Sequence, residues 1–389
     1  MYATRHLSLC RKDPSILQTH PQESSSSGYI VITDEESAAE DTCCWGTCND
    51  NDVREFPFAT NKIVSTVYAS AGGDRFQTDR VWFLPVLDQP LSSNRYYVIT
   101  ALGKHTGQAC TCSKEEDMST CCFCKAPNDV KPRVLDHRDI YQQVEVSKTS
   151  RGYTAESVAP DGFPPSFLRK RGWRIRTATT FHCQLADALG LNVSIRKRLP
   201  PEPNISSKVS TPVVVGEWYC PFVFIIEGLP KEQMKNSLFY KMTLDQSWEE
   251  IYTCENHNSA GGSVSVNKTL QKEAIGLFGD EAEKDDAQDG DGFVWYRHVK
   301  PNNKEGSKLG LSAEIVEKMK WVQQRGGYEI EGENRDVTVE RVEKFGGGYE
   351  WRRFSFFVLV ERFALRRMDG SLVLTCDYKH IHQTRSKWD

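Results

Sequence analysis

The densest group of chemically reactive side chains in this sequence is a set of eight cysteines between positions 43 and 124. Two C-x-C pairs stand out, Cys110 with Cys112 and Cys122 with Cys124. Four sulfurs from two short segments could complete the tetrahedral shell that a structural zinc ion requires. The usual zinc finger has two residues between paired cysteines, whereas each pair here has one. These four residues are therefore a candidate zinc site with unusual spacing. The rest of the group is Cys43, Cys44, Cys48 and Cys121.

Two other interpretations of these cysteines stay open. Cysteine is among the most buried residue types, so several could be inert thiols in a core. Lys114 and Lys125 lie close enough in sequence to lower a thiol pKa, which would favour a redox-responsive set. Thirteen cysteines is an odd number for complete disulfide pairing, and residues 1–10 contain no apolar signal region. We expect free thiols or metal in a reducing compartment, the cytoplasm, with the nucleus as an alternative and organelle transit disfavoured.

Two basic segments form the next candidate site. The first contains Arg169, Lys170, Arg171 and Arg174 around Trp173, and the second is 196–198. Cations interleaved with an aromatic ring could bind an anionic ligand or a protein partner. A solvated charged face explains the same pattern. Forty-nine basic and 53 acidic residues give a net charge of −4, which disfavours nucleic acid as a partner.

A third candidate is the pair His380-x-His382, which falls on an expected strand. Alternation along a strand puts both rings on one face together with Cys376 and Tyr378. Such a face could bind a metal, but it is equally typical of a polar, half-exposed sheet surface.

Motifs with a known mechanism are missing from the sequence. It contains no G-x-x-x-x-G-K-[ST], H-E-x-x-H or G-x-S-x-G element. The longest apolar runs have five residues, which are far too short to span a membrane. Cofactors other than zinc and a membrane span are therefore not expected.

These candidate residues are carried mostly by expected strands. The pattern predicts an α+β fold that is β-rich, with mainly antiparallel sheets, a few short helices and one longer helix near 312–325. The strongest strand signal is a hairpin of 351–366 and 371–382 around Asp369-Gly370, since Asp-Gly is a strong hairpin turn. A short helix is expected from Phe181 to Leu189, with Thr180 as its cap and Gly190 at its end.

The expected organisation is a Cys-rich β-rich part, 1–150, and an α+β part, 151–389, with one continuous unit as an alternative. Residues 255–292 are expected to form a loop. Within it, Asp280 to Asp291 carries seven acids and predicts a solvated acidic loop.

Several longer motifs point to a family. On them the chain resembles the plant family known as domain of unknown function 1262, and the resemblance runs from Tyr2 to Trp388. It implies a plant source and a single full-length unit, and it implies no activity, cofactor or catalytic residue. The motifs are Leu87–Tyr97, Glu116–Met118 before Cys121–Cys124, Asp139–Gln143, Ala159–Pro165, Val215–Phe222 and Arg367–Leu372.

Two functional hypotheses follow. The first is a non-enzymatic intracellular interaction or regulatory module, with zinc or redox sensitivity in its N-terminal half. The alternative is an enzyme or small-ligand binder that uses a pocket between the two β-rich parts, lined by His380, His382 and the basic segment near Arg169.

Overall fold

A computed structural model divides the chain into two compact units. Unit 1 comprises Met1–Ala188 and Tyr219–Phe239, and unit 2 comprises Leu189–Trp218 and Tyr240–Asp389. Position 150, where the sequence placed a boundary, lies in the turn between two paired strands of unit 1. The structure describes residues 1–21, 25–40, 42–43, 48–49, 51–69, 76–121, 124–256, 262–285, 292–299, 308–329, 336–347 and 350–389.

The main sheet of unit 1 has seven strands in the order β12-β11-β8-β7-β6-β13-β5. Its pairs are antiparallel, and Val81 and Phe83 on β7 point into one core with Val98 and Tyr96 of β8. Trp173 also lies in this core. The strands are β5 Asp52–Val53, β6 Lys62–Ala69, β7 Phe76–Pro85, β8 Arg95–Thr100, β11 Gln143–Thr149, β12 Gly152–Ser157 and β13 Arg174–His182.

The other elements of unit 1 are short. The strands are β1 Tyr2–His6, β2 Gly28–Ile32, β3 Thr42–Cys43, β4 Cys48–Asn49, β9 Met118–Cys121, β10 Cys124–Pro127 and β16 Ile225–Ile226. The α-helices are α1 Leu7–Lys12, α2 Glu35–Glu40, α3 Ser166–Arg169 and α5 Pro230–Asn236. The 3-10 helices are η1 Pro14–Gln18, η2 Leu91–Ser93, η3 Glu115–Asp117, η4 Ile140–Gln142 and η5 Phe222–Phe224. Strand β15, Val213–Pro221, runs from unit 2 into unit 1.

The parallel pair β1 and β2 brings the start of the chain beside residues 26 positions later. Their register runs from Tyr2 opposite Gly28 to His6 opposite Ile32. Gly28 is required here, because a Cβ atom would lie 2.4 Å from the Tyr2 ring. The pairing therefore places His6 next to the turn that follows β2.

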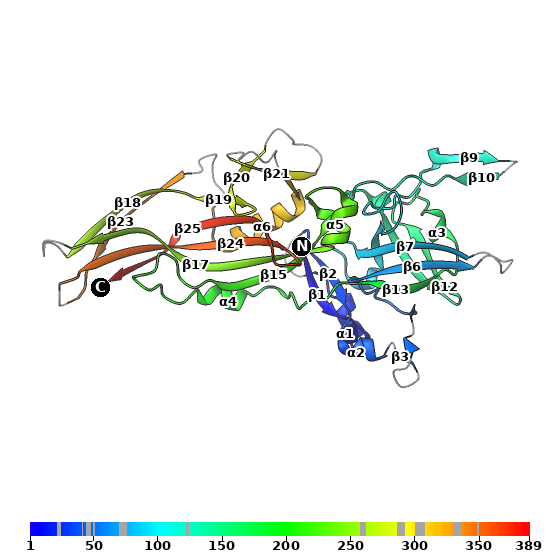
Figure 1. Cartoon of the computed structure of the whole chain (residues 1–389), viewed down its shortest axis with the longest axis horizontal. Coiled ribbons are helices and arrows are strands. Elements are labelled where there is room, and N and C mark those ends of the chain that lie inside the picture. The colour runs from blue at the N-terminus through cyan, green and yellow to red at the C-terminus, as the bar shows by residue number, and fades with distance from the viewer. Residues whose placement is uncertain are drawn as a thin grey trace. The chain divides into compact units, whose positions relative to one another are not determined.

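Unit 2 is built on three long antiparallel strands, β17 Phe239–Glu255, β24 Arg353–Arg367 and β25 Leu372–Trp388 (Figure 1). The predicted C-terminal hairpin is confirmed as β24 and β25. Shorter strands extend the sheet in the order β25-β19-β20-β21-β22. Their bounds are β19 Glu273–Leu277, β20 Asp280–Lys284, β21 Phe293–His298 and β22 Leu309–Ser312; β14, Gly190–Leu191, pairs with β15.

A two-stranded ribbon, β18 Ser263–Gln271 and β23 Asp336–Lys344, packs its valines on the aromatic end of this sheet. The prediction of a loop over 255–292 is therefore wrong for 263–284, which form β18, β19 and β20. The acids of β20 tolerate a strand because Glu283 pairs with Arg297 at 2.9 Å on the neighbouring strand, while Ala282 is buried. Residues 286–291 lie outside the described ranges.

The long helix predicted at 312–325 is confirmed as α6, Ala313–Arg325, with its predicted face of Ile315, Val316, Met319 and Val322 buried. In the described part of unit 2 there is one more α-helix, α4, Val193–Arg198. The helix predicted at 181–189 is wrong. Strand β13 continues to His182, and the Thr4 amide donates to the Ala188 carbonyl, so this segment bonds to other strands instead of to itself.

The fold is thus β-rich and mainly antiparallel, with few helices. Over the described ranges, none of those helices has the length and apolar composition needed to cross a membrane.

Candidate functional site

Cys110 and Cys112 of the candidate zinc site lie in the apolar core of unit 1. Burial raises the pKa of the Cys110 thiol to about 12 and that of Cys112 to about 11, against hydrogen bonds with Thr100 and Ser157 that lower them. Both thiols are therefore protonated near neutral pH and lie among hydrophobic side chains. This arrangement favours the interpretation of these two residues as buried, inert thiols.

The other half of that candidate site lies outside what the structure describes. Cys122 falls between the described ranges, and only the backbone of Cys124 is described, opposite Cys121 in the β9–β10 hairpin. Within the described ranges, no three His, Cys, Asp or Glu side chains are grouped to hold a metal. The four-cysteine zinc site stays a prediction.

The first basic segment is split between paired and exposed cations. Arg169 forms an ion pair with Asp129 at 3.3 Å, and Lys170 donates to Gln77 at 2.7 Å. Arg171 and Arg174 are exposed. The two halves of this candidate site thus do different things, one tying α3 to neighbouring segments and the other facing solvent.

The histidine pair leads to a buried polar cluster in unit 2. The register places Gln246 of β17 opposite Glu361 of β24, and His380 of β25 opposite Leu359, two positions along the same face of β24. Helices α4 and α6 cover this face, because Arg196 on α4 reaches both Glu361 and the Val322 carbonyl of α6. We call Arg196, Gln246, Gln323, Glu361 and His380 the unit 2 network.

Glu361 is the centre of the unit 2 network. Arg196 donates to its two oxygens from Nε at 2.8 Å and Nη2 at 2.6 Å, and Gln246 donates from Nε2 at 2.8 Å. The side chain of Glu361 is 1% exposed and that of Arg196 is 9% exposed. Burial alone would raise the pKa of Glu361, but hydrogen bonds from His380 and Arg196 and their charges lower it to about 2. The carboxylate is therefore ionised at any physiological pH.

His380 closes the unit 2 network against α6. Its Nε2 lies 2.9 Å from Gln323 Oε1 and 3.4 Å from Glu361 Oε2. Tyr328, just beyond α6, packs edge-on against the same ring. His382 is more exposed, and burial together with the neighbouring His380 lowers its pKa. The two histidines share a face, as the spacing predicts, but His380 is buried while His382 lies at the edge.

Chemically, the unit 2 network holds elements together. A bidentate Arg–carboxylate pair is a strong, directional contact, and losing one buried member leaves an uncompensated charge. Both oxygens of Glu361 already accept hydrogen bonds from two directions, so this carboxylate has no lone pair directed at solvent as a general base would need. The network fixes α4 and α6 to β17, β24 and β25.

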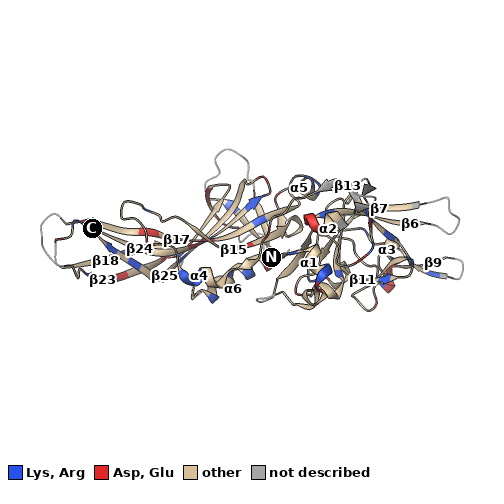
Figure 2. Cartoon of the chain, turned by 90° about the horizontal axis from the view of Figure 1, so that it is seen from below, with Lys and Arg blue, Asp and Glu red and all other residues tan. Residues whose placement is uncertain are grey.

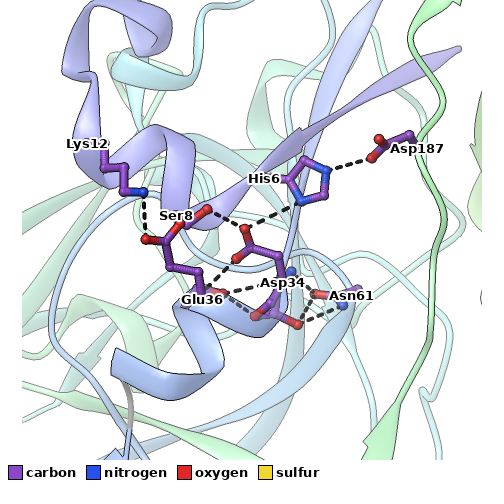
Figure 3. Close-up of polar contacts among 9 residues, drawn as sticks. His6, Ser8, Lys12, Asp34, Glu36, Asn61 and Asp187 are labelled. Carbon is purple, nitrogen blue, oxygen red and sulfur yellow. Dashed lines mark hydrogen bonds and ion pairs between the residues drawn. The ribbon is translucent and has the colours of Figure 1, made fainter.

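A second cluster lies at the surface of unit 1, around His6 (Figure 3). His6 Nε2 lies 2.6 Å from Asp187 Oδ1, and His6 Nδ1 lies 3.6 Å from Asp34 Oδ2. The side chain of His6 is 39% exposed and that of Asp187 is 57% exposed. We call His6, Ser8, Asp34 and Asp187 the His6 clasp, since it joins β1, the turn after β2 and the segment that follows β13.

The His6 clasp contains the residue types of a catalytic triad without its geometry. Ser8 donates to Asp34, not to His6, so the imidazole is not placed to remove the serine proton. Burial would raise the pKa of Asp34, but hydrogen bonds from Ser37 and Ser8 lower it to about 2. The clasp is a set of polar contacts at the surface.

Sequence reasoning missed most of these residues. Glu361 had a signal in the sequence. It is one acid between the apolar run 356–360 and Phe363, and such a continuous apolar run is typical of a strand that is buried on both faces. Arg196 was noticed only as part of a basic run. Nothing local marked His6 or Asp187, which are 181 residues apart in the chain.

A family model and a solved structure are similar to this chain or to part of it. The sequence model of an uncharacterised family, described as "Protein of unknown function (DUF1262)", matches residues 23–123. The match supports an uncharacterised domain family over that segment, while a plant source and the full-length resemblance stay predictions. No curated protein matches.

Among solved structures, the crystal structure of Cry35Ab1 is similar at a TM-score of 0.49 and 11% identity, covering 85% of this chain and 90% of that one.

Proposed function

We propose that this protein is a non-enzymatic interaction module, a β framework that displays a surface to a macromolecular partner. The supporting observation is the unit 2 network. His380, which the sequence suggested as a pocket residue, is buried in this network against Gln323, and Glu361 at its centre accepts from Arg196 and Gln246. A site for general acid–base chemistry needs a titrating group that faces a substrate.

The thiols of unit 1 support the same proposal. Cys110 and Cys112 have raised pKa values because they are buried, whereas a redox switch needs an accessible thiolate. Zinc or redox control through Cys122 and Cys124 is the regulatory form of this proposal. We also propose a location in the cytoplasm of a plant cell, supported by the family resemblance and by free thiols at Cys10, Cys220 and Cys376.

The proposal is tested by finding out what the native protein carries. The tagged full-length chain is isolated from the cells that express it, cross-linked, and analysed by mass spectrometry for proteins and, after denaturation, for small molecules. We expect a protein partner whose cross-links map to one surface and persist in H382A. A stoichiometric small molecule with no protein partner would contradict the proposal.

Thiol chemistry is tested on the same material. Metal analysis and thiol titration of protein purified without chelator should find Cys110 and Cys112 unreactive until the chain unfolds. Rapid modification of either thiol in the native protein would show that the core is open there. One zinc per chain that is lost in C122S/C124S would establish the regulatory form.

A further inference from the structure

The short helix α4 combines one buried cation with two exposed ones. Arg196 is fixed by Glu361 and Val322, and Asn192 caps the helix by accepting from the Ile195 amide. The next two residues, Lys197 and Arg198, are exposed, and neither has an ion pair within the described chain. The buried anchor therefore fixes the backbone of α4, which carries these two exposed charges at the surface of unit 2. Figure 2 shows α4 with its basic residues in blue.

More cations border the segment that follows α4. The carbonyl of Pro203 accepts from Lys387 at 2.8 Å, which places the segment beside β25. The Trp248 indole donates to the Pro200 carbonyl at 3.2 Å, and the Arg385 guanidinium lies over the same ring. Lys208 is exposed at the far end of the segment. Residues 193–210 contain one acid, Glu202.

Exposed aliphatic side chains accompany these cations. Of the six large apolar residues that are exposed in the described part of unit 2, four lie between positions 189 and 214. Two of them are brought together by the backbone, since the Asn192 amide donates to Val215 and so sets Val193 beside Val214. The four residues are Leu189, Val193, Val209 and Val214.

The exposed cations and the exposed aliphatic side chains together indicate the chemistry of a partner. We infer that the 189–214 segment, with Arg385 and Lys387, is a docking surface for an acidic amphipathic segment of a partner protein. This inference rests on the proposed function and names the surface that carries it. Carboxylates complement Lys197, Arg198 and Lys208, while the partner's aliphatic side chains cover the exposed valines.

Other polyanions fit this surface less well. Single-stranded nucleic acid needs exposed rings on which bases can stack, and the one indole beside Arg385, that of Trp248, is 1% exposed. The cations are spread along α4, the segment after it and β25, whereas a small phosphate needs donors that converge on one point. A polypeptide can follow such a line.

The probe is a fluorescein-labelled peptide of four Glu-Glu-Leu repeats, and its binding to the full chain is followed by fluorescence anisotropy. We expect salt-sensitive binding that falls about tenfold or more in K197E/R198E, since both cations lie in the interface. The matched control is R171E/R174E, which makes the same charge change at exposed positions of unit 1 and should alter affinity less than about threefold. V193S/V209S should weaken binding at high salt, where the apolar contacts dominate.

Three outcomes would overturn the inference. The first is that the wild type does not bind the peptide, and the second is that the two charge-reversal variants lose affinity equally. The third is that an oligonucleotide displaces the labelled peptide at a lower concentration of negative charges than an unlabelled copy of the peptide does. Far-ultraviolet circular dichroism checks that each variant is folded. If one of these three outcomes is observed while cross-links identify a partner on another surface, this inference is wrong and the proposed function stands.

Discussion

The unit 2 network and the His6 clasp each place a histidine beside a carboxylate, but in opposite surroundings. Glu361 and His380 are each 1% exposed, whereas His6 and Asp187 are 39% and 57% exposed. An exposed ion pair contributes about 0–1 kcal/mol to stability, while removal of one member of a buried pair costs about 3–5 kcal/mol. The unit 2 network should therefore decide whether its unit folds, and the His6 clasp should adjust how tightly β1 is held.

The largest effect is expected for Glu361→Gln, which leaves the Arg196 charge buried without its counter-ion. We expect a loss of about 3–5 kcal/mol in the free energy of unfolding of unit 2, measured by hydrogen exchange of β24 amides. The control is Asp377→Asn on β25, which removes an equally short bidentate pair with the half-exposed Arg362. It should cost about 1 kcal/mol or less, and equal losses would remove burial as the cause.

The next largest effect is expected in the free energy of unfolding at acidic pH. The pKa of Glu361 falls from an ordinary 4.5 to about 2 on folding, so its ionised form stabilises the protein above about pH 4.5. That stabilisation, on the order of 3 kcal/mol, should be lost as the pH falls from 4.5 toward 2. Carbon-13 carboxyl titration should give a midpoint near 2 for Glu361. A midpoint near its ordinary value would show that Arg196 does not hold the carboxylate in its ionised form.

A smaller loss is expected for His380→Leu, which keeps roughly the same volume but removes the contacts of the imidazole with Gln323 Oε1 and with Glu361. Leaving a buried acceptor unsatisfied costs about 1–3 kcal/mol. Hydrogen exchange at the C-terminal end of α6 should report the loss. Unchanged protection there would mean that Tyr328 and the apolar face of α6 hold the helix without the histidine.

The smallest effect is expected for His6→Ala, which removes the two contacts that the imidazole makes in the clasp. The loss should be about 1 kcal/mol or less, seen in the exchange of the β1 and β2 amides. A loss above about 2 kcal/mol would place this surface clasp with the buried network.

The sequence predicted elements where a local pattern was strong. The Asp369-Gly370 turn and the apolar face of residues 312–325 both led to elements that the structure contains. The prediction was wrong where residues distant in sequence form the backbone hydrogen bonds of a segment. Phe181–Leu189 is such a segment, since its backbone bonds to Asn61 and Thr4. The two clusters could not be predicted for the same reason, because partners such as Arg196 and Glu361 lie 165 residues apart in the sequence. The local signals were the His380-x-His382 spacing and the lone acid in the apolar strand β24.

The most direct test of the structural role of the unit 2 network is the coupling between Arg196 and Glu361. A double-mutant cycle compares R196M, E361L and R196M/E361L by unfolding in denaturant. Each single variant should lose several kcal/mol, because a buried charge is left alone, and the double variant should lose at least about 2 kcal/mol less than the sum. Additive losses, or single losses below about 1 kcal/mol, would contradict the account and return Glu361 and His380 to the list of groups available for chemistry.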